Sequence, residues 1–271
     1  MTPRNFLVRG LLAGLIAGLL TFAVAYLAGE PSVDAAIAVE AKGEDAGTTA
    51  HSHGDGNEHS HDDAAATHSH GEDGGTEVSR ENQSTWGLLT ATVSTGIALG
   101  GITALAAAFA LGRIGRLRPS QSTALVAALG FVSVALVPFI KYPATPPAVG
   151  DADTIGARTT QYFVMLAISV VAMIAAVLLF RAILERVGTY TAVLVSAGAY
   201  LAVAVLAAAL MPTVNEIGDF PADTLWYFRR GSLMTLATLW GVIGIVLTGL
   251  IGKLYAEESA TQARRDLAAS L

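Results

Sequence analysis

The feature that most constrains this chain is a set of six long apolar stretches without a charged residue. These are Leu11–Ala28, Asn82–Gly112, Pro119–Ile140, Thr159–Phe180, Val187–Asn215 and Gly231–Gly252. A helix of about 20 apolar residues spans the roughly 30 Å hydrocarbon core of a bilayer. The sequence therefore predicts an all-α polytopic integral membrane protein with about six transmembrane helices.

The low charge content supports the same interpretation. Only 14% of the 271 residues are charged, whereas soluble proteins carry about 25%. Two arginines precede the first apolar run, as in a signal peptide, but the run is longer than the roughly 7–15 residues typical of such a signal. We therefore expect a retained first helix. In a single membrane domain over 1–271, we predict helices near 6–28, 86–111, 121–140, 161–183, 189–211 and 232–254.

Lysine and arginine indicate the orientation, because cytoplasmic loops of membrane proteins are enriched in them. With a cytoplasmic N-terminus, ten of the sixteen basic residues fall inside and eighteen of the twenty-two acids fall outside. The short loop GRIGRLRPS at 112–120 contributes three arginines and no acid. The sequence thus predicts a multi-pass plasma-membrane protein with cytoplasmic N- and C-termini and an extracytoplasmic segment at 29–85.

Small residues recur at the four-residue spacing that lets transmembrane helices pack closely. They are Gly10, Gly14 and Gly18 in the first span, Gly96 and Gly100 in the second, and Gly244, Thr248 and Gly252 in the sixth. Packing inside one bundle is the simpler explanation, and contact between copies in an oligomer is the alternative.

All six histidines lie within twenty residues between the first two spans. They form three His-Ser-His pairs: His51 and His53, His59 and His61, and His68 and His70. Residues 41–81 contain too few large apolar side chains to offset the entropy of ordering the segment. We predict a long, disordered extracytoplasmic loop, rich in His, Asp and Glu, that binds metal ions. An incidental cluster of histidines in a solvated acidic linker is the alternative.

This loop does not select one metal by itself. Imidazole suits Co²⁺, Ni²⁺, Cu²⁺ and Zn²⁺, and for the same ligands Ni²⁺ binds more tightly than Co²⁺. Two histidines two residues apart in a flexible chain can both reach one ion, so we expect several labile sites that raise the local ion concentration. Binding requires neutral imidazole and should weaken below about pH 6.

Acidic residues at the predicted outer helix ends are candidates for the entrance of a cation pathway. These residues are Glu30, Asp34, Asp219 and Asp223. For the first two, charges favoured by the dipole of a short helix after Pro31 are an equally good explanation. The charged loops around 141–158 and 212–230 are expected to cover the outer mouth of the bundle. No predicted span carries a mid-membrane charge, which argues against a proton relay there.

Three stretches of the chain resemble the CbtA family of cobalt transporter subunits. They are FLVRGLLAGLIAGLLTFAVAYLAGEPSVDAAIAVE, PFIKYPATPPAVGDADTIGARTTQY and GDFPADTLWYFRRGS. The resemblance covers most of the chain in order. It implies a membrane subunit for cobalt uptake with five or six spans, beside a small His-bearing partner of the CbtB type, and it supplies no ion-binding residues.

We therefore predict a membrane subunit that takes up a divalent transition metal, with Co²⁺ the expected ion and Ni²⁺ or Zn²⁺ the alternatives. A metal-binding sensor or accessory protein without its own pore, and a metal exporter, are competing hypotheses. The sequence has no cysteine and no phosphate-binding loop of the GxxxxGK[ST] type. We expect no enzyme activity, no organic cofactor and no nucleic-acid partner.

Overall fold

The computed structural model describes residues 2–48, 78–115 and 117–270, and every regular element in these ranges is helical. The α-helices are α1 (Pro3–Val24), α2 (Glu30–Thr48), α3 (Arg80–Asn82), α4 (Leu88–Ala110), α5 (Pro119–Gly130), α6 (Val137–Lys141), α7 (Ile155–Leu210) and α8 (Ala222–Ala269). Between them lie the π-helical turns η1 (Ala25–Gly29), η3 (Gln83–Gly87) and η4 (Phe131–Leu136), and the 3-10 turn η5 (Ala152–Thr154).

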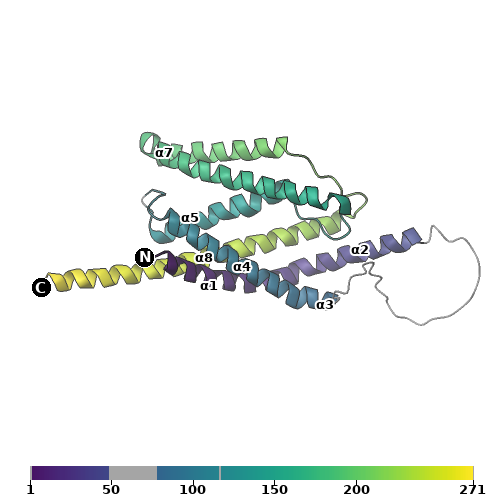
Figure 1. Cartoon of the computed structure of the whole chain (residues 1–271), viewed down its shortest axis with the longest axis horizontal. Helices are drawn as coiled ribbons and strands as arrows, with labels where there is room; N and C mark the ends of the chain where they lie inside the picture. The colour runs from purple at the N-terminus through teal and green to yellow at the C-terminus, as the bar shows by residue number, and fades with distance from the viewer. Residues whose placement is uncertain (1, 49–77, 116, 271) are drawn as a thin grey trace, which may run out of the picture.

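Five helical runs in the described ranges are long and apolar enough to cross a membrane, which confirms the predicted class of polytopic helical protein. They are Pro3–Lys42, Arg80–Ala110, Pro119–Lys141, Ala152–Leu210 and Ala222–Ala269. The fourth contains α7, which has 56 residues and is interrupted at Gly188 by φ 78° and ψ 166°. Its two arms lie side by side (Figure 1). Because α7 is a hairpin, one helical run accounts for two of the predicted apolar spans.

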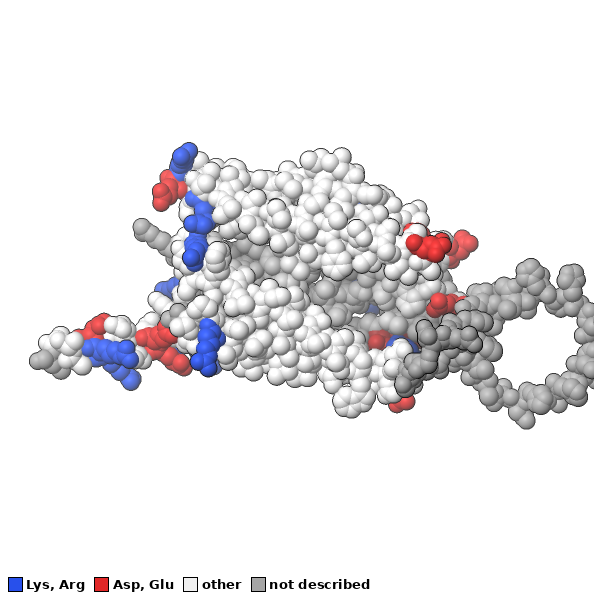
Figure 2. All heavy atoms as spheres, in the orientation of Figure 1, with Lys and Arg blue, Asp and Glu red and all other residues white. Residues whose placement is uncertain are grey.

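Both chain termini lie at one end of the bundle, which we call the terminal end (Figure 1). The opposite end, where α6 ends and α8 begins, is called the cavity end below. In Figure 2, Lys and Arg gather mainly at the terminal end, together with acids of the C-terminal part, whereas Asp and Glu predominate at the cavity end. The band between the two ends is uncharged on this face, as a bilayer requires.

The glycine row of α1 packs directly against α4. A Cβ atom on Gly14 would lie 2.7 Å from the carbonyl carbon of Gly96, and one on Gly18 would lie 2.7 Å from the Thr92 carbonyl oxygen. A Cβ on Gly100 would lie 2.7 Å from the Cα of Gly14. These separations are possible only without side chains, so the rows in the first and second spans serve packing within one bundle.

Helix α8 completes the apolar core on this contact. Its buried Leu247 and Ile251 belong to one cluster with Phe6 and Ala13 of α1 and Ala104 of α4. The third small-residue row, on α8, faces α5 more loosely: a Cβ on Gly244 would lie 3.3 Å from the Cβ of Ala127. Helices α1, α4 and α8 therefore share one buried apolar cluster and form one bundle.

Two of the π-helical turns end two residues before a proline. At η1, the Glu30 N–H donates to the Ala25 carbonyl five residues back, and Pro31 follows. At η4, the Val137 N–H donates to the Val132 carbonyl, and Pro138 follows. A proline in a regular helix lacks a donor and clashes with the carbonyl four residues earlier. The wider turn relieves this conflict, so both helices continue past their prolines.

This continuity is the main difference from the predicted helix boundaries. No separate short helix begins after Pro31, because α1, η1 and α2 form one run to Thr48. Residues 41–48 and 80–81, predicted to be disordered, are therefore helical. Helix α8 likewise extends the predicted 232–254 to Ala222–Ala269. Its polar end is rich in Ala, Glu and Arg, which favour helix without being apolar.

Candidate functional site

A cavity of about 760 Å³ lies at the cavity end, where η1, α2, α6, α7 and α8 converge. It falls within the size range of small-molecule sites. Its lining extends along α8 from Phe228 to Leu236. Apolar side chains form part of the wall, and three basic and two acidic residues add charge: Lys141, Arg158, Arg229, Glu30 and Glu216.

Glu216 joins the two loops that border this cavity. Its carboxylate accepts hydrogen bonds from the Thr154 hydroxyl at 2.8 Å and the Asp151 N–H at 3.1 Å. It also forms an ion pair with Arg158, with 3.4 Å between Oε2 and Nε. The Thr154 and Asp151 hydrogen bonds, with the Arg158 charge, lower the pKa of Glu216 below its usual value. One carboxylate oxygen of Glu216, Oε2, therefore makes all three of these contacts and connects the two loops.

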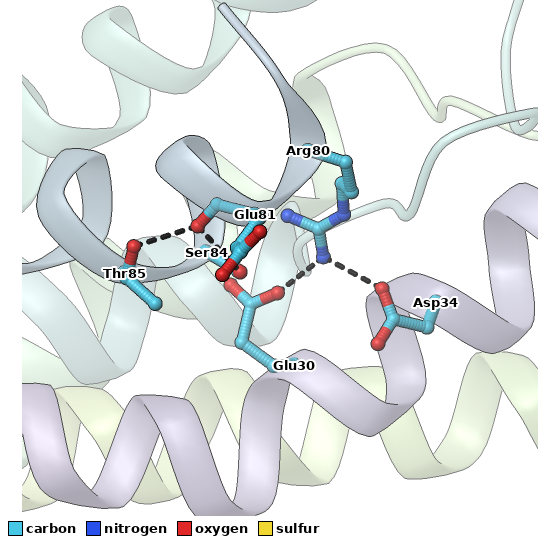
Figure 3. Close-up of polar contacts among 6 residues, drawn as sticks. All are labelled: Glu30, Asp34, Arg80, Glu81, Ser84 and Thr85. Atoms are coloured by element: carbon cyan, nitrogen blue, oxygen red, sulfur yellow. Dashed lines mark hydrogen bonds and ion pairs between the residues drawn. The ribbon is translucent and has the colours of Figure 1, made fainter. Parts of the chain in front are cut away.

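Glu30 and Asp34 share a cation at the start of α2. They lie four residues apart, on one face of the helix. The guanidinium of Arg80, from the start of α3, lies between their carboxylates (Figure 3). Its Nη2 donates to both, at 2.9 Å in the case of Asp34. The Glu30 side chain is 14% exposed and that of Asp34 is 64% exposed, so only Glu30 reaches the cavity wall.

Two further side chains at the cavity bind backbone carbonyls of the loop after α7. Lys141 Nζ donates to the Met211 carbonyl at 3.1 Å, and the Tyr142 hydroxyl donates to the Pro212 carbonyl at 2.8 Å. Burial raises the pKa of Tyr142. These contacts fix the wall formed by the segment after α6 against the end of α7.

Arg229 differs from Arg158 of the same wall in having no ion-pair partner. The Nε atoms of both arginines are buried without a hydrogen-bond partner. Arg158 forms an ion pair with Glu216, whereas no carboxylate of the described residues forms one with Arg229. The hydroxyls beside it, Ser232 and Thr235, donate to helix carbonyls one turn back. Arg229 thus brings to the cavity a positive charge that no described residue neutralises.

The structure brings together only part of the predicted entrance. Glu30 and Asp34 are neighbours, but Asp219 and Asp223 are exposed and do not line the cavity. Asp223 lies in the first turn of α8, where its negative charge interacts favourably with the helix dipole. Within the described residues, no group of three or more His, Asp or Glu side chains is placed to hold a metal ion. The six predicted histidine ligands lie outside the described residues.

Of the charged residues that line the cavity, only Glu30 was singled out from the sequence. Lys141, Arg158, Glu216 and Arg229 occur in the two charged loops expected at the outer mouth, and these loops do meet through Glu216. The usable signal was the presence of opposite charges in both loops. The role of Arg80 had no signal, because it is 46 residues from Asp34 across the histidine segment.

The model of the family described as "Probable cobalt transporter subunit (CbtA)" matches residues 3–252, from the start of α1 to the apolar part of α8. No curated protein and no solved structure matches the chain.

Proposed function

Since the chain belongs to the CbtA family of probable cobalt transporter subunits, we propose that it is the membrane subunit of an uptake system for a divalent transition metal, with Co²⁺ as the transported ion. The observation that supports this most strongly is that the family match, over residues 3–252, contains four of the five long apolar helices of the described residues and the apolar part of the fifth. Ni²⁺ and Zn²⁺ remain the alternative ions, because the chemistry of the histidine segment accepts them as well.

The proposed topology has six crossings, with both termini in the cytoplasm and the cavity end outside. The hairpin of α7 supports six crossings, and the excess of basic residues at the terminal end supports this orientation. A reporter enzyme that works only in the cytoplasm should be active when it is fused after residue 271. Activity at that position only of a reporter that works outside the cytoplasm would contradict the topology.

The histidine segment would serve as the collector of metal ions in this system. Its six imidazoles, at positions 51–70, are followed within ten residues by Arg80 at the cavity end. Weak sites in a tethered segment raise the ion concentration near the mouth without fixing one ion. The segment gathers ions and does not form the path through the hydrocarbon, where unsatisfied polar groups are costly.

The acids at the cavity end would form the entrance. Asp219 and Asp223 are exposed and attract cations to the surface. Glu30 and Asp34 already hold Arg80, so an incoming ion would bind them in exchange for the guanidinium. This exchange makes the pair a selective step, because a divalent ion competes better than a monovalent one for two carboxylates.

A small His-bearing membrane subunit of the CbtB type is the proposed partner. If the chain has no pathway of its own, it would act as an accessory subunit that delivers metal to that partner. Metal uptake would then require both proteins, whereas the chain alone would bind metal at the cell surface without accumulating it inside.

Two sets of variants separate the collector from the entrance. Replacing all six histidines with alanine should weaken uptake mainly at scarce metal, since the collector matters least when ions are abundant. Neutralising Glu30, Asp34, Asp219 and Asp223 to Gln or Asn should lower uptake at every concentration. Glu257→Gln, at the terminal end of α8, is the control for loss of one negative charge.

Transport measured across a series of metal concentrations decides between these roles. If the six-alanine variant is inactive even at high metal, the segment is part of the obligatory path and the collector role is wrong. If neither set changes uptake, the accessory role replaces that of a transport subunit.

A further inference from the structure

The cavity carries more positive than negative charge once its ion pairs are assigned. Glu216 is occupied by Arg158, and Glu30 is occupied by Arg80. Lys141 and Arg229 remain, and no carboxylate of the described residues pairs with either. Lys141 gives one donor to the Met211 carbonyl and keeps two for a ligand. A cavity with this balance attracts anions and repels a bare metal ion.

Arg229 indicates most clearly which kind of ligand the cavity can bind. Its Nε is buried and has no acceptor in the described residues. A partly desolvated cation without a partner costs free energy, and its planar donors match the two oxygens of a carboxylate or phosphate. The adjacent Arg230 shows the contrast: it is exposed, lies 4.8 Å above the Tyr227 ring, and does not line the cavity.

The remaining wall indicates the rest of the ligand. Phe139, Val149 and Phe228 supply apolar surface, and the volume of about 760 Å³ is far larger than an inorganic ion needs. The hydroxyls of Ser232 and Thr235, the nearest to Arg229 along α8, are used within the helix, so the charged donors for a ligand are those of the two cations.

We propose that this cavity binds an organic oxyanion, a molecule whose carboxylate or phosphate is held by Arg229 and Lys141 while its carbon skeleton contacts the apolar wall. A water-soluble polycarboxylate and the headgroup of an anionic lipid share this chemistry. Glu30, which belongs to the proposed metal entrance, also lines this cavity. Anion binding by Arg229 nevertheless requires no metal, so it can be tested independently of the proposed function.

The test uses the full-length protein in nanodiscs of phosphatidylcholine, in buffer freed of metal by resin. Citrate and inorganic phosphate are titrated by calorimetry. In a second arm, the discs contain phosphatidylglycerol, and the lipid retained by the protein is measured by native mass spectrometry. The variants are Arg229→Gln and Arg229→Lys, and Arg230→Gln is the matched control for loss of a neighbouring charge.

We expect Arg229→Gln to weaken binding of citrate, or retention of phosphatidylglycerol, at least about tenfold, whereas Arg229→Lys keeps most of it and Arg230→Gln all of it. Without an anion, Arg229→Gln should melt at or above the temperature of the unchanged protein, because the unpartnered charge is removed. The arm that responds identifies the source of the anion. Binding in neither arm, or equal weakening by Arg229→Gln and Arg230→Gln, would overturn the proposal.

Discussion

Replacing Gly14 with alanine should force helices α1 and α4 apart. The new Cβ would lie 2.7 Å from the Gly96 carbonyl carbon and 2.8 Å from the Ile97 Cα. The Gly96 carbonyl oxygen would be closer still. Ordinary contact begins at 3.4 Å, so the backbones must separate by at least about 0.7 Å, the difference between 3.4 and 2.7 Å. Backbone atoms on both sides cannot rotate away, and overpacking of this kind costs about 2 kcal/mol.

This cost should lower the melting temperature by roughly 4–8 °C, at about 2–4 °C per kcal/mol for a chain of this size. The measurement is thermal unfolding of the purified protein in detergent, followed by tryptophan fluorescence. Gly198→Ala on α7 is the matched control, because a Cβ there meets nothing within 4 Å. If Gly14→Ala and Gly198→Ala melt at the same temperature, α1 and α4 are not in backbone contact and this description of the bundle fails.

Three further perturbations test other parts of the structure. Tyr200→Phe removes the 2.9 Å hydrogen bond to Ser169 between the arms of α7 and should cost about 0.5–1 kcal/mol in the same melting assay; no change would show that the arms are held by apolar contact alone. Gly188→Ala places a Cβ at φ 78°, where it meets no atom within 4 Å, so about 1–3 kcal/mol of backbone strain should appear without a clash; an unchanged melting temperature would refute the strained turn. The pKa of Glu216 is lowered in the folded protein, so its contribution is present above the usual glutamate pKa and lost as the pH falls through the lowered value. Protease cleavage near Arg158 should therefore increase below about pH 4, and Glu216→Gln should remove that dependence; equal pH dependence in the variant would exclude Glu216 as the cause.

The long helices were predictable because their signal is local. A run of about 20 residues without charge has few alternatives to a spanning helix, and the predicted 121–140 differs from Pro119–Lys141 by only a few residues. The apolar runs could not show where a helix continues into polar sequence. The run through Pro31 depends on the π-helical turn at η1, and the polar end of α8 depends on helix propensity alone.

The candidate site was less predictable because its contacts are distant in sequence. Glu30 and Asp34 follow the first span and were found from that position, but their partner Arg80 lies across the histidine segment. The choice of Asp219 and Asp223 over Glu216 shows the same difficulty: three acids lie within eight residues, and only the fold shows that Glu216 faces the cavity. The excess positive charge of the wall emerged only after ion pairs were assigned.

Metal accumulation in cells with and without this protein tests the central claim most directly. Cells that lack other uptake systems for these metals would be supplied with Co²⁺, Ni²⁺ and Zn²⁺ separately, with and without the small His-bearing partner subunit. The proposed function predicts that cells with the protein accumulate Co²⁺ above the control, and that the gain disappears when Glu30 and Asp34 are neutralised together. Equal Co²⁺ content in cells with and without the protein, even with the partner present, would contradict an uptake subunit for cobalt.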